Sequence, residues 1–233
     1  SLLPFNRKER YFTGTVLPMI VASDGFAHLE RLLTLCGLPG VVDPGYDGHQ
    51  PFQFFTEYSF GESIQPSDVE RFGAAKGKDA PDVVLVGADW LLCIEAKMYH
   101  CPTRESLGQQ LRVQRSLMDI WSGSLGIPDE RVRQVLLVRE SYATELTPFA
   151  GVVTVTWEQL AKAYLGVAPA YWMGQLLHAN AASHLVSKAA PYGANRDGHL
   201  TGHEIVLGNL VDPETGKEFI SMGRSGGLDG AAL

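Results

Sequence analysis

The sequence lacks the features that mark an exported, membrane-bound or disulfide-rich protein. It has only 3 cysteines, an odd number without a CxxC pair, which excludes a disulfide framework and indicates a reducing compartment. Its longest apolar stretch near the start, residues 16–22, is far shorter than the roughly 20 residues that cross a bilayer, and the charged residues before it lead to no cleavage-site pattern. We therefore expect a cytoplasmic protein that does not enter a membrane.

An excess of positive charge is also missing. The 19 lysines and arginines stand against 26 aspartates and glutamates, a net charge of −7, so no global basic field draws the chain to nucleic acid or to anionic lipid. Any contact with nucleic acid must be local. The composition does include 45% hydrophobic residues, enough for a core, and 233 residues correspond to one domain with a small appendage.

The order of the hydrophobic patterns predicts an α/β fold. Helical spacing indicates helices at residues 7–22 with a kink at Pro18, at 24–36, at 103–121 and at 156–165. Apolar or aromatic runs predict strands at residues 52–60, 83–86, 91–94, 132–138 and 152–155. We expect an α/β/α sandwich with a mixed central sheet over residues 1–168. Residues 169–233, which open with a helix near 171–189, are expected to form a small C-terminal subdomain.

Two acids and a lysine stand at the ends of a predicted hairpin. A turn centred between residues 88 and 89 places Asp82 directly opposite Glu95, with both side chains on one face. Lys97, two residues after Glu95, shares that face. Neighbouring carboxylates repel unless a cation lies between them, and carboxylate oxygens suit Mg²⁺ or Mn²⁺. Because an adjacent ammonium can assist an attacking water, the pattern indicates hydrolysis of a phosphodiester.

The same residues resemble a known family motif. Pro81-Asp82, a spacer of 12 residues and Glu95-Ala96-Lys97 are similar to the PD-(D/E)XK nuclease superfamily, which includes many restriction endonucleases, and the resemblance covers about residues 9–165. It implies a restriction-endonuclease-like fold and a Mg²⁺- or Mn²⁺-dependent endonuclease, with DNA favoured over RNA. It also implies that Asp82 and Glu95 bind the metal and that Lys97 assists the water. The ordinary alternative for these charges is an ion pair at a strand edge.

Two further positions follow from the resemblance. Members of the superfamily often carry another acid in the first helix or strand, and Glu57 and Glu9 are the candidate metal ligands here, with Glu30 as a third. Each of these acids is otherwise a solvated or capping residue. Relatives also place a glutamine on the helix after the lysine, which makes Gln110 our candidate substrate-binding residue. Gln114 shares its helical face, and an exposed polar face is the alternative for both.

Other charged residues give weaker indications. Six arginines lie between residues 104 and 139, and with Arg71, Lys76 and Lys78 they either line a groove for phosphates or form a scattered surface. His199 and His203 have no evident third zinc ligand, and the glycine-rich residues 223–227 lack the lysine spacing of a phosphate-binding loop, which favours a tight turn.

Two alternatives to a nuclease stay open. One is a non-catalytic restriction-endonuclease-like module that binds nucleic acid or a partner protein. The other is a hydrolase of a smaller phosphate ester, which needs a closed pocket where a nuclease needs an open groove. The sequence leaves open whether the protein forms a homodimer or acts with a partner protein.

Overall fold

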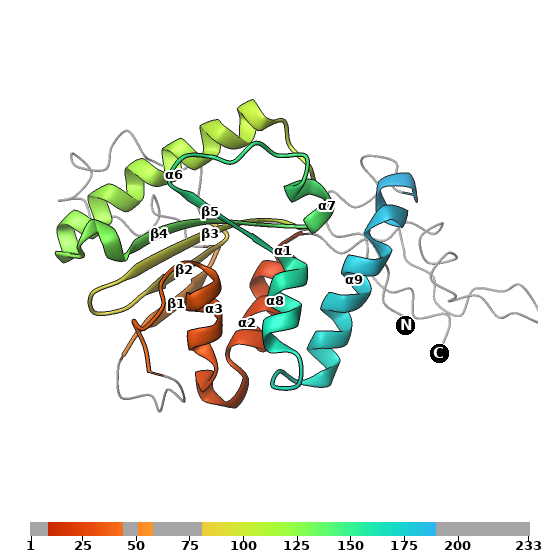
Figure 1. The fold of residues 1–233 in the computed structure, drawn as a ribbon, viewed down its shortest axis with the longest axis horizontal. Coiled ribbons are helices and arrows are strands. Elements are labelled where there is room, and N and C mark those ends of the chain that lie inside the picture. Colours follow the sequence, from red (N-terminus) through yellow and green to blue (C-terminus); the bar gives the residue numbers. More distant parts are fainter. Residues whose placement is uncertain (1–8, 44–50, 58–80, 190–233) are drawn as a thin grey trace, which may run out of the picture. The chain divides into compact units, whose positions relative to one another are not determined.

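The computed structural model describes residues 9–43, 51–57 and 81–189, which form an α/β fold on one open sheet (Figure 1). The strands in these ranges are β1 (Gln53–Thr56), β2 (Val83–Val86), β3 (Leu91–Lys97), β4 (Val132–Val138) and β5 (Val152–Thr156). They lie in chain order across the sheet. The β1–β2 and β2–β3 pairs are antiparallel and the β3–β4 and β4–β5 pairs are parallel, so the sheet is mixed, as expected.

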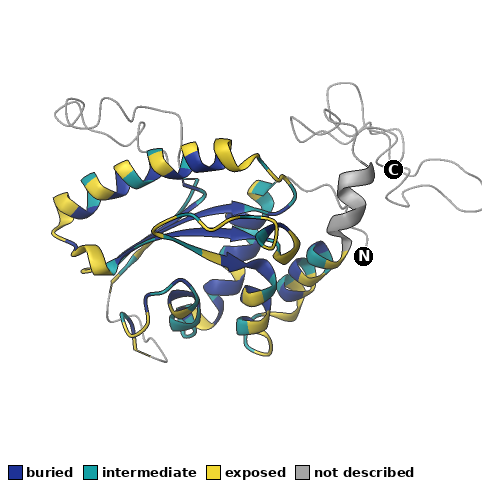
Figure 2. Ribbon diagram, turned by 45° about the horizontal axis from the view of Figure 1, so that its top comes forward, coloured by how far each residue is buried: buried dark blue, intermediate teal, exposed yellow. Residues whose placement is uncertain are grey.

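Helices cover both faces of this sheet (Figures 1 and 2). One face carries α6 (Arg104–Leu125) and the short α7 (Glu140–Ala143). The other carries α1 (Glu9–Tyr11), a π-helix (Phe12–Val16), α2 (Leu17–Val21), α3 (Leu29–Leu35), α8 (Trp157–Tyr164) and the first part of α9 (Ala170–Ala189). The strands are buried between these layers, whereas the outer face of α6 is exposed (Figure 2). This layering is compatible with an α/β sandwich.

The central hairpin contributes to the cores on both sides of the sheet. Leu85 and Ile94 pack into the large core beneath α2, α3 and α8. Val84 and Cys93, the alternate residues, pack into the core beneath α6. Because both faces are covered, β2 and residues 91–94 of β3 are continuous apolar runs, which confirms the prediction of strands buried on two sides.

The register of the hairpin is the predicted one. Val83 pairs with Ile94, which places the preceding Asp82 opposite Glu95. At the other end, the Gly87 N–H donates to the Trp90 carbonyl at 2.9 Å and closes the turn. Gly87 cannot be replaced here without movement, because a Cβ atom on it would lie 2.1 Å from Nε1 of Trp90. β3 continues to Lys97, so Glu95 and Lys97 both belong to the strand.

Several element boundaries differ from those expected. The first helix is irregular, with the π-helical residues ending immediately before α2, where Pro18 lacks the N–H that would continue the ladder. The second helix begins at Leu29 and not at residue 24, because Asp24, Gly25 and Phe26 have positive φ angles of 51°, 65° and 68°. β1 ends at Thr56 because Glu57 also has a positive φ, of 55°. Residues 58–60 of the expected strand lie outside the described residues.

The helix that follows residue 168 packs into the main core. Met173, Leu176 and Ala179 of α9 are buried in the same cluster as the residues of α2 and α3. The compact unit therefore runs from Glu9 to Asn180, past the boundary at 168 expected from the sequence. In the part of the chain that the structure describes, no helix combines the length and hydropathy of a membrane span. Some expected features lie outside this part, namely Arg71, Lys76, Lys78, His199, His203 and residues 223–227.

Candidate functional site

Charged side chains meet at the end of β3 that lies away from the hairpin turn. Glu95 and Lys97 belong to β3, and Asp82 immediately precedes β2. Since Cys93 faces α6, strand alternation puts Glu95 and Lys97 on the same face of the sheet. The structure therefore brings together the three residues of the predicted motif, and α1 and α6 each add a further residue to them.

Glu95 is the most deeply buried acid of this group, with 1% of its surface exposed. Its Oε1 atom accepts a hydrogen bond from Nζ of Lys97, and its Oε2 atom accepts one from Nε2 of Gln114 at 2.6 Å. A buried carboxylate is costly without such partners. Both oxygens of Glu95 are thus held in place by donors from two different elements.

Asp82 faces Glu95 across the hairpin. Its Oδ2 atom accepts the backbone N–H of Ala96 at 2.7 Å, which fixes the carboxyl group against β3. Burial, together with the charge of Glu95, raises the pKa of Asp82 to about 8, and the Ala96 N–H and Lys97 only partly oppose this. A cation bound beside Asp82 would oppose this shift, because it would favour the charged form of the carboxyl group.

Glu9, the first residue of α1, also lies at this end of β3. Its Oε1 atom accepts the backbone N–H of Met98 at 2.7 Å, and its Oε2 atom lies 4.0 Å from Nζ of Lys97. Burial raises the pKa of Glu9 to about 7, although Lys97 and the Met98 N–H oppose the shift. Glu9 is therefore the predicted additional acid that the structure places beside Lys97.

Lys97 is the cation at the centre of the group, and its side chain is only 10% exposed. Burial alone would lower the pKa of Lys97, but Glu95, Glu9 and Asp82 together raise it above its ordinary value. Lys97 therefore carries its charge at neutral pH. One ammonium group faces three carboxyl groups, and its charge only partly offsets the effect of burial on the pKa values of Glu9 and Asp82.

The other two candidate acids have different partners. Glu57 adjoins Asp82 in the sheet, where its N–H donates to the Asp82 carbonyl at 2.9 Å. Its carboxylate, however, accepts from Nε of Arg10 at 3.0 Å and from the Thr13 hydroxyl at 3.3 Å. Glu30, on α3, lies 3.8 Å from Arg31 and acts on the pKa of a tyrosine of α8, away from the motif residues.

The glutamine bonded to the site is Gln114 and not the predicted Gln110. Gln114 is 1% exposed and donates to Glu95, whereas Gln110 is half-buried and its side chain has no hydrogen bond among the described residues. The sequence contained a signal for this difference, because Gln114 falls in the buried stripe of α6 between Leu111 and Leu117. A polar residue at such a position needs a buried partner.

The side chains at the end of β3 are of the type that holds a hard divalent cation. Asp82, Glu95 and Glu9 offer carboxylate oxygens, which suit Mg²⁺ or Mn²⁺. Among the described residues, however, no three His, Cys, Asp or Glu side chains stand ready as a metal-binding group. Lys97 instead lies between the carboxylates, and both oxygens of Glu95 have donors. A metal ion held at Oε1 of Glu95 would either share that atom with Lys97 or displace it.

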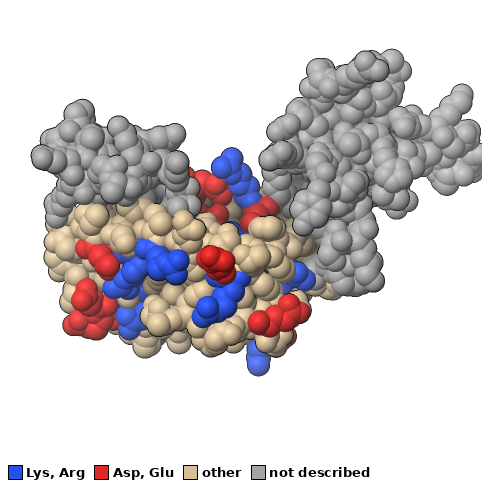
Figure 3. Space-filling model, turned by 90° about the horizontal axis from the view of Figure 1, so that it is seen from above, with Lys and Arg blue, Asp and Glu red and all other residues tan. Residues whose placement is uncertain are grey.

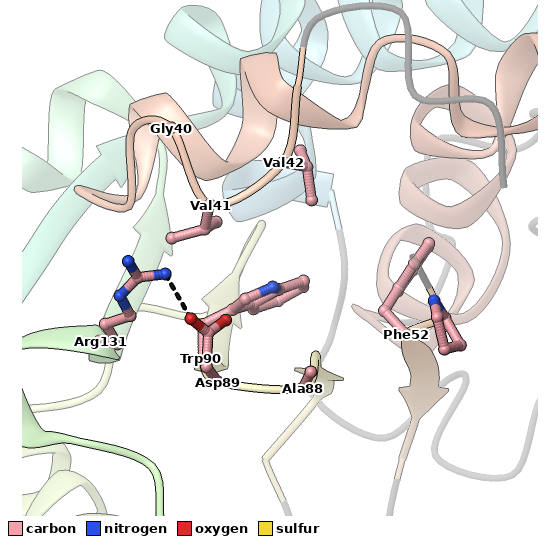
Figure 4. A pocket seen from close by; sticks show the side chains of 9 residues that line it. Gly40, Val41, Val42, Phe52, Ala88, Asp89, Trp90 and Arg131 are labelled. Atoms are coloured by element: carbon pink, nitrogen blue, oxygen red, sulfur yellow. Dashed lines mark hydrogen bonds and ion pairs between the residues drawn. The ribbon is translucent and has the colours of Figure 1, made fainter. Parts of the chain in front are cut away.

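A cavity of about 440 Å³ lies at the opposite end of the hairpin (Figure 4). Phe52 and Trp90 lie along it, and Arg131 pairs with Asp89 at its edge at 2.7 Å. Asp82, Glu95 and Lys97 are not among its lining residues. The cavity is therefore separate from the candidate site.

Comparisons with protein-family models, curated proteins and solved structures find no match for the chain.

Proposed function

We propose that the protein is a metal-dependent nuclease that hydrolyses phosphodiester bonds, acting as an endonuclease on DNA. We further propose that its fold is restriction-endonuclease-like and related to the PD-(D/E)XK nucleases. The observation that carries the proposal is the opposition of Asp82 and Glu95 across the β2–β3 hairpin with Lys97 on the same face. A mixed sheet between helical layers, with α6 following the lysine, supports it.

In this proposal Asp82 and Glu95 hold Mg²⁺ or Mn²⁺, and Glu9 completes the site. The metal would supply a Lewis acid for the phosphate and a lowered pKa for a bound water. The chain itself keeps the carboxylates in position, because Ala96 donates to Asp82 and Gln114 donates to Glu95. Carboxylates oriented in this way need little rearrangement when a cation arrives.

Lys97 orients the attacking water in the proposed reaction. Its ammonium group is charged at neutral pH and nearly enclosed, so it can donate to a water or to a phosphate oxygen as negative charge develops. If a metal took the place of Nζ at Glu95, the ammonium group of Lys97 would be free to donate elsewhere. The ion pair between Lys97 and Glu95 thus holds the lysine next to the metal site before the metal binds.

The alternatives receive less support from the site. A non-catalytic module has no need to bury Asp82 and Glu9 in positions where their pKa values are raised to about 8 and about 7, since such burial destabilises the fold at neutral pH. A hydrolase of a small phosphate ester needs an enclosed pocket at the reacting groups, and the cavity beside Trp90 contains none of them.

The test is a cleavage assay with matched variants. Linear, circular and single-stranded DNA, and RNA, are incubated with the wild type, Asp82→Asn or Lys97→Met in EDTA, Mg²⁺ or Mn²⁺. Asp89→Asn serves as the control, because it removes an acid from the turn of the same hairpin. Cutting that needs the metal, survives in the control and disappears in the other two variants supports the proposal.

Calorimetric titration with Mn²⁺ completes this test. Asp82→Asn should weaken Mn²⁺ binding, whereas Lys97→Met should bind Mn²⁺ at least as tightly as the wild type, because no ammonium group then competes for Glu95. Cutting that persists in EDTA or in both variants would overturn the proposal. A wild-type protein that neither cuts nor binds Mn²⁺ would favour the binding module.

A further inference from the structure

The arginines of the predicted basic groove have separate surroundings. On the α6 side of the molecule, basic and acidic side chains are interspersed (Figure 3). Five of the six arginines between residues 104 and 139 are exposed or occupied elsewhere: Arg104 lies 5.0 Å from the centre of the Phe149 ring, Arg112 is exposed, Arg115 pairs with Asp119, Arg131 pairs with Asp89, and Arg133 donates to the Gly37 carbonyl. These arginines do not form a shared groove.

Arg139 differs from them in its place on the sheet. It follows directly after Val138, the last residue of β4, which pairs with Lys97 in the parallel register. β3 and β4 therefore end side by side. The backbone of Arg139 lies at the edge of the sheet where the carboxylates and Lys97 meet. The charge of Arg139 also acts on the hydroxyl group of Tyr99, two residues after Lys97.

The guanidinium group of Arg139 has no strong partner. Its Nε atom is buried without a hydrogen bond among the described residues. Nη1 donates to the Ser141 hydroxyl at 3.4 Å and Nη2 to the Cys101 sulfur at 3.5 Å, both long contacts to neutral acceptors. No carboxylate pairs with it in the described structure. A cation with five donors is thus left without an anion, and Arg139 is itself partly exposed to solvent.

We propose that Arg139 binds a backbone phosphate of the nucleic acid next to the bond that is cleaved. A guanidinium fork matches two phosphate oxygens, and a partly buried one loses less of the interaction to solvent than an exposed lysine does. The proposal rests on the proposed nuclease function and assigns a substrate-binding residue to it. Arg139 makes no contribution to metal binding in this scheme, so its loss should act on substrate affinity.

The experiment measures DNA binding in EDTA, where no cutting occurs, alongside cutting in Mn²⁺. Labelled single-stranded and duplex DNA are titrated with the wild type, Arg139→Gln, Arg139→Lys and Arg115→Ala over a series of salt concentrations. Arg139→Gln keeps a polar side chain and removes the charge, and Arg115→Ala removes an arginine of α6 that pairs with Asp119. Thermal unfolding of each variant shows whether it is folded. If Arg139→Gln does not fold, Arg139→Lys still tests the role of the guanidinium group.

We expect Arg139→Gln to weaken binding by about tenfold and to reduce the slope of log affinity against log salt by about one. In Mn²⁺ the same variant should raise KM more than it lowers kcat. Arg139→Lys should recover only part of the affinity, because it keeps the charge without the fork, and Arg115→Ala should bind like the wild type.

The results distinguish a failure of the role proposed for Arg139 from a failure of the proposed nuclease function. If the wild type cuts DNA while Arg139→Gln binds it as tightly as Arg115→Ala does, Arg139 is not a phosphate-binding residue and the nuclease proposal stands. If the wild type neither cuts nor binds any nucleic acid, the nuclease proposal fails and the role of Arg139 fails with it.

Discussion

Glu9 and Met98 are joined by a hydrogen bond of 2.7 Å although 89 positions separate them in the chain. The bond fixes α1 to the residue that follows β3 and places the Glu9 carboxylate beside Lys97. Glu57, the other leading candidate for the additional acid, is nearer to Asp82 along the sheet but is bound by Arg10 and Thr13. Because the contacts of Glu9 and Glu57 differ, replacing each acid should have a different effect on metal binding.

Replacing Glu9 should affect metal binding more than replacing Glu57. Glu9→Gln keeps an acceptor for the Met98 N–H but removes a charge beside Lys97, so we expect Mn²⁺ affinity to fall by about 10- to 100-fold. Glu57→Gln breaks an ion pair with the exposed Arg10 and should change the affinity less than about twofold. Calorimetric titration measures both, and a larger loss in Glu57→Gln would assign the metal site to Glu57.

The stability of the metal-free protein should decrease from about pH 5.5 to about pH 8.5. Burial raises the pKa of Asp82 to about 8 and that of Glu9 to about 7, so the folded state keeps protons that the unfolded chain has already lost. Their contribution to the free energy of unfolding is complete below the ordinary carboxyl values of 3.8 and 4.5 and is lost as the pH rises through about 7 and 8. The raised pKa of Lys97 changes the free energy of unfolding only above the ordinary lysine value of 10.5, which is outside this pH range.

Urea unfolding in EDTA at the two pH values measures this dependence. Asp82→Asn should flatten it, because the amide does not titrate, and Mn²⁺ should restore stability at the higher pH by neutralising the carboxylates. An Asp82→Asn variant with the same pH dependence as the wild type would show that Asp82 does not contribute to it.

The two glutamines of α6 should differ in what their loss changes. Gln114→Met keeps the size of the side chain but leaves Oε2 of the buried Glu95 without its donor, which should cost about 1–3 kcal/mol of unfolding free energy. Gln110→Met should leave the stability within about 0.5 kcal/mol, since Gln110 is only half-buried. If Gln110 binds substrate, as the sequence predicts, its replacement should raise KM with little effect on unfolding. Chemical denaturation and steady-state cleavage separate these effects.

Two glycine substitutions should act in opposite directions. A Cβ atom at position 87 would lie 2.1 Å from Nε1 of Trp90, so Gly87→Ala should destabilise the hairpin by about 1–3 kcal/mol. Gly123 lies within α6 and has open space around the position of a Cβ atom, so Gly123→Ala should stabilise the protein by about 0.5–1 kcal/mol. Urea denaturation compares the two, and a neutral Gly87→Ala would show that Trp90 can move aside.

The parts of the site that were predictable from the sequence depend on residues close to one another in the chain. The register of the hairpin followed from its short turn, and the two-sided burial of β2 and β3 followed from their uninterrupted apolar residues. The bond from Glu9 to Met98 was not predictable, because it depends on how α1 packs at the end of the sheet. The same holds for Gln114, whose partner Glu95 lies on another element.

The boundaries that were missed depend on backbone conformation. Three consecutive residues with positive φ delay the second helix to Leu29, and only one of the three is a glycine. Hydrophobic spacing carries no information on such a turn. The packing of α9 on the main core likewise depends on which surface α2 and α8 leave uncovered, which becomes known only in three dimensions.

The wide separation of the site residues along the chain affects when the site can form during synthesis. Glu9 leaves the ribosome long before its partner Met98, and Gln114 follows only after the whole hairpin has been made. β3 becomes an interior strand later still, when β4 pairs with it. Such non-local contacts form slowly, after the intervening loops have closed. A nascent chain therefore carries Glu9 without an assembled carboxylate group until Gln114 has been made, and β3 becomes an interior strand only after β4 has followed.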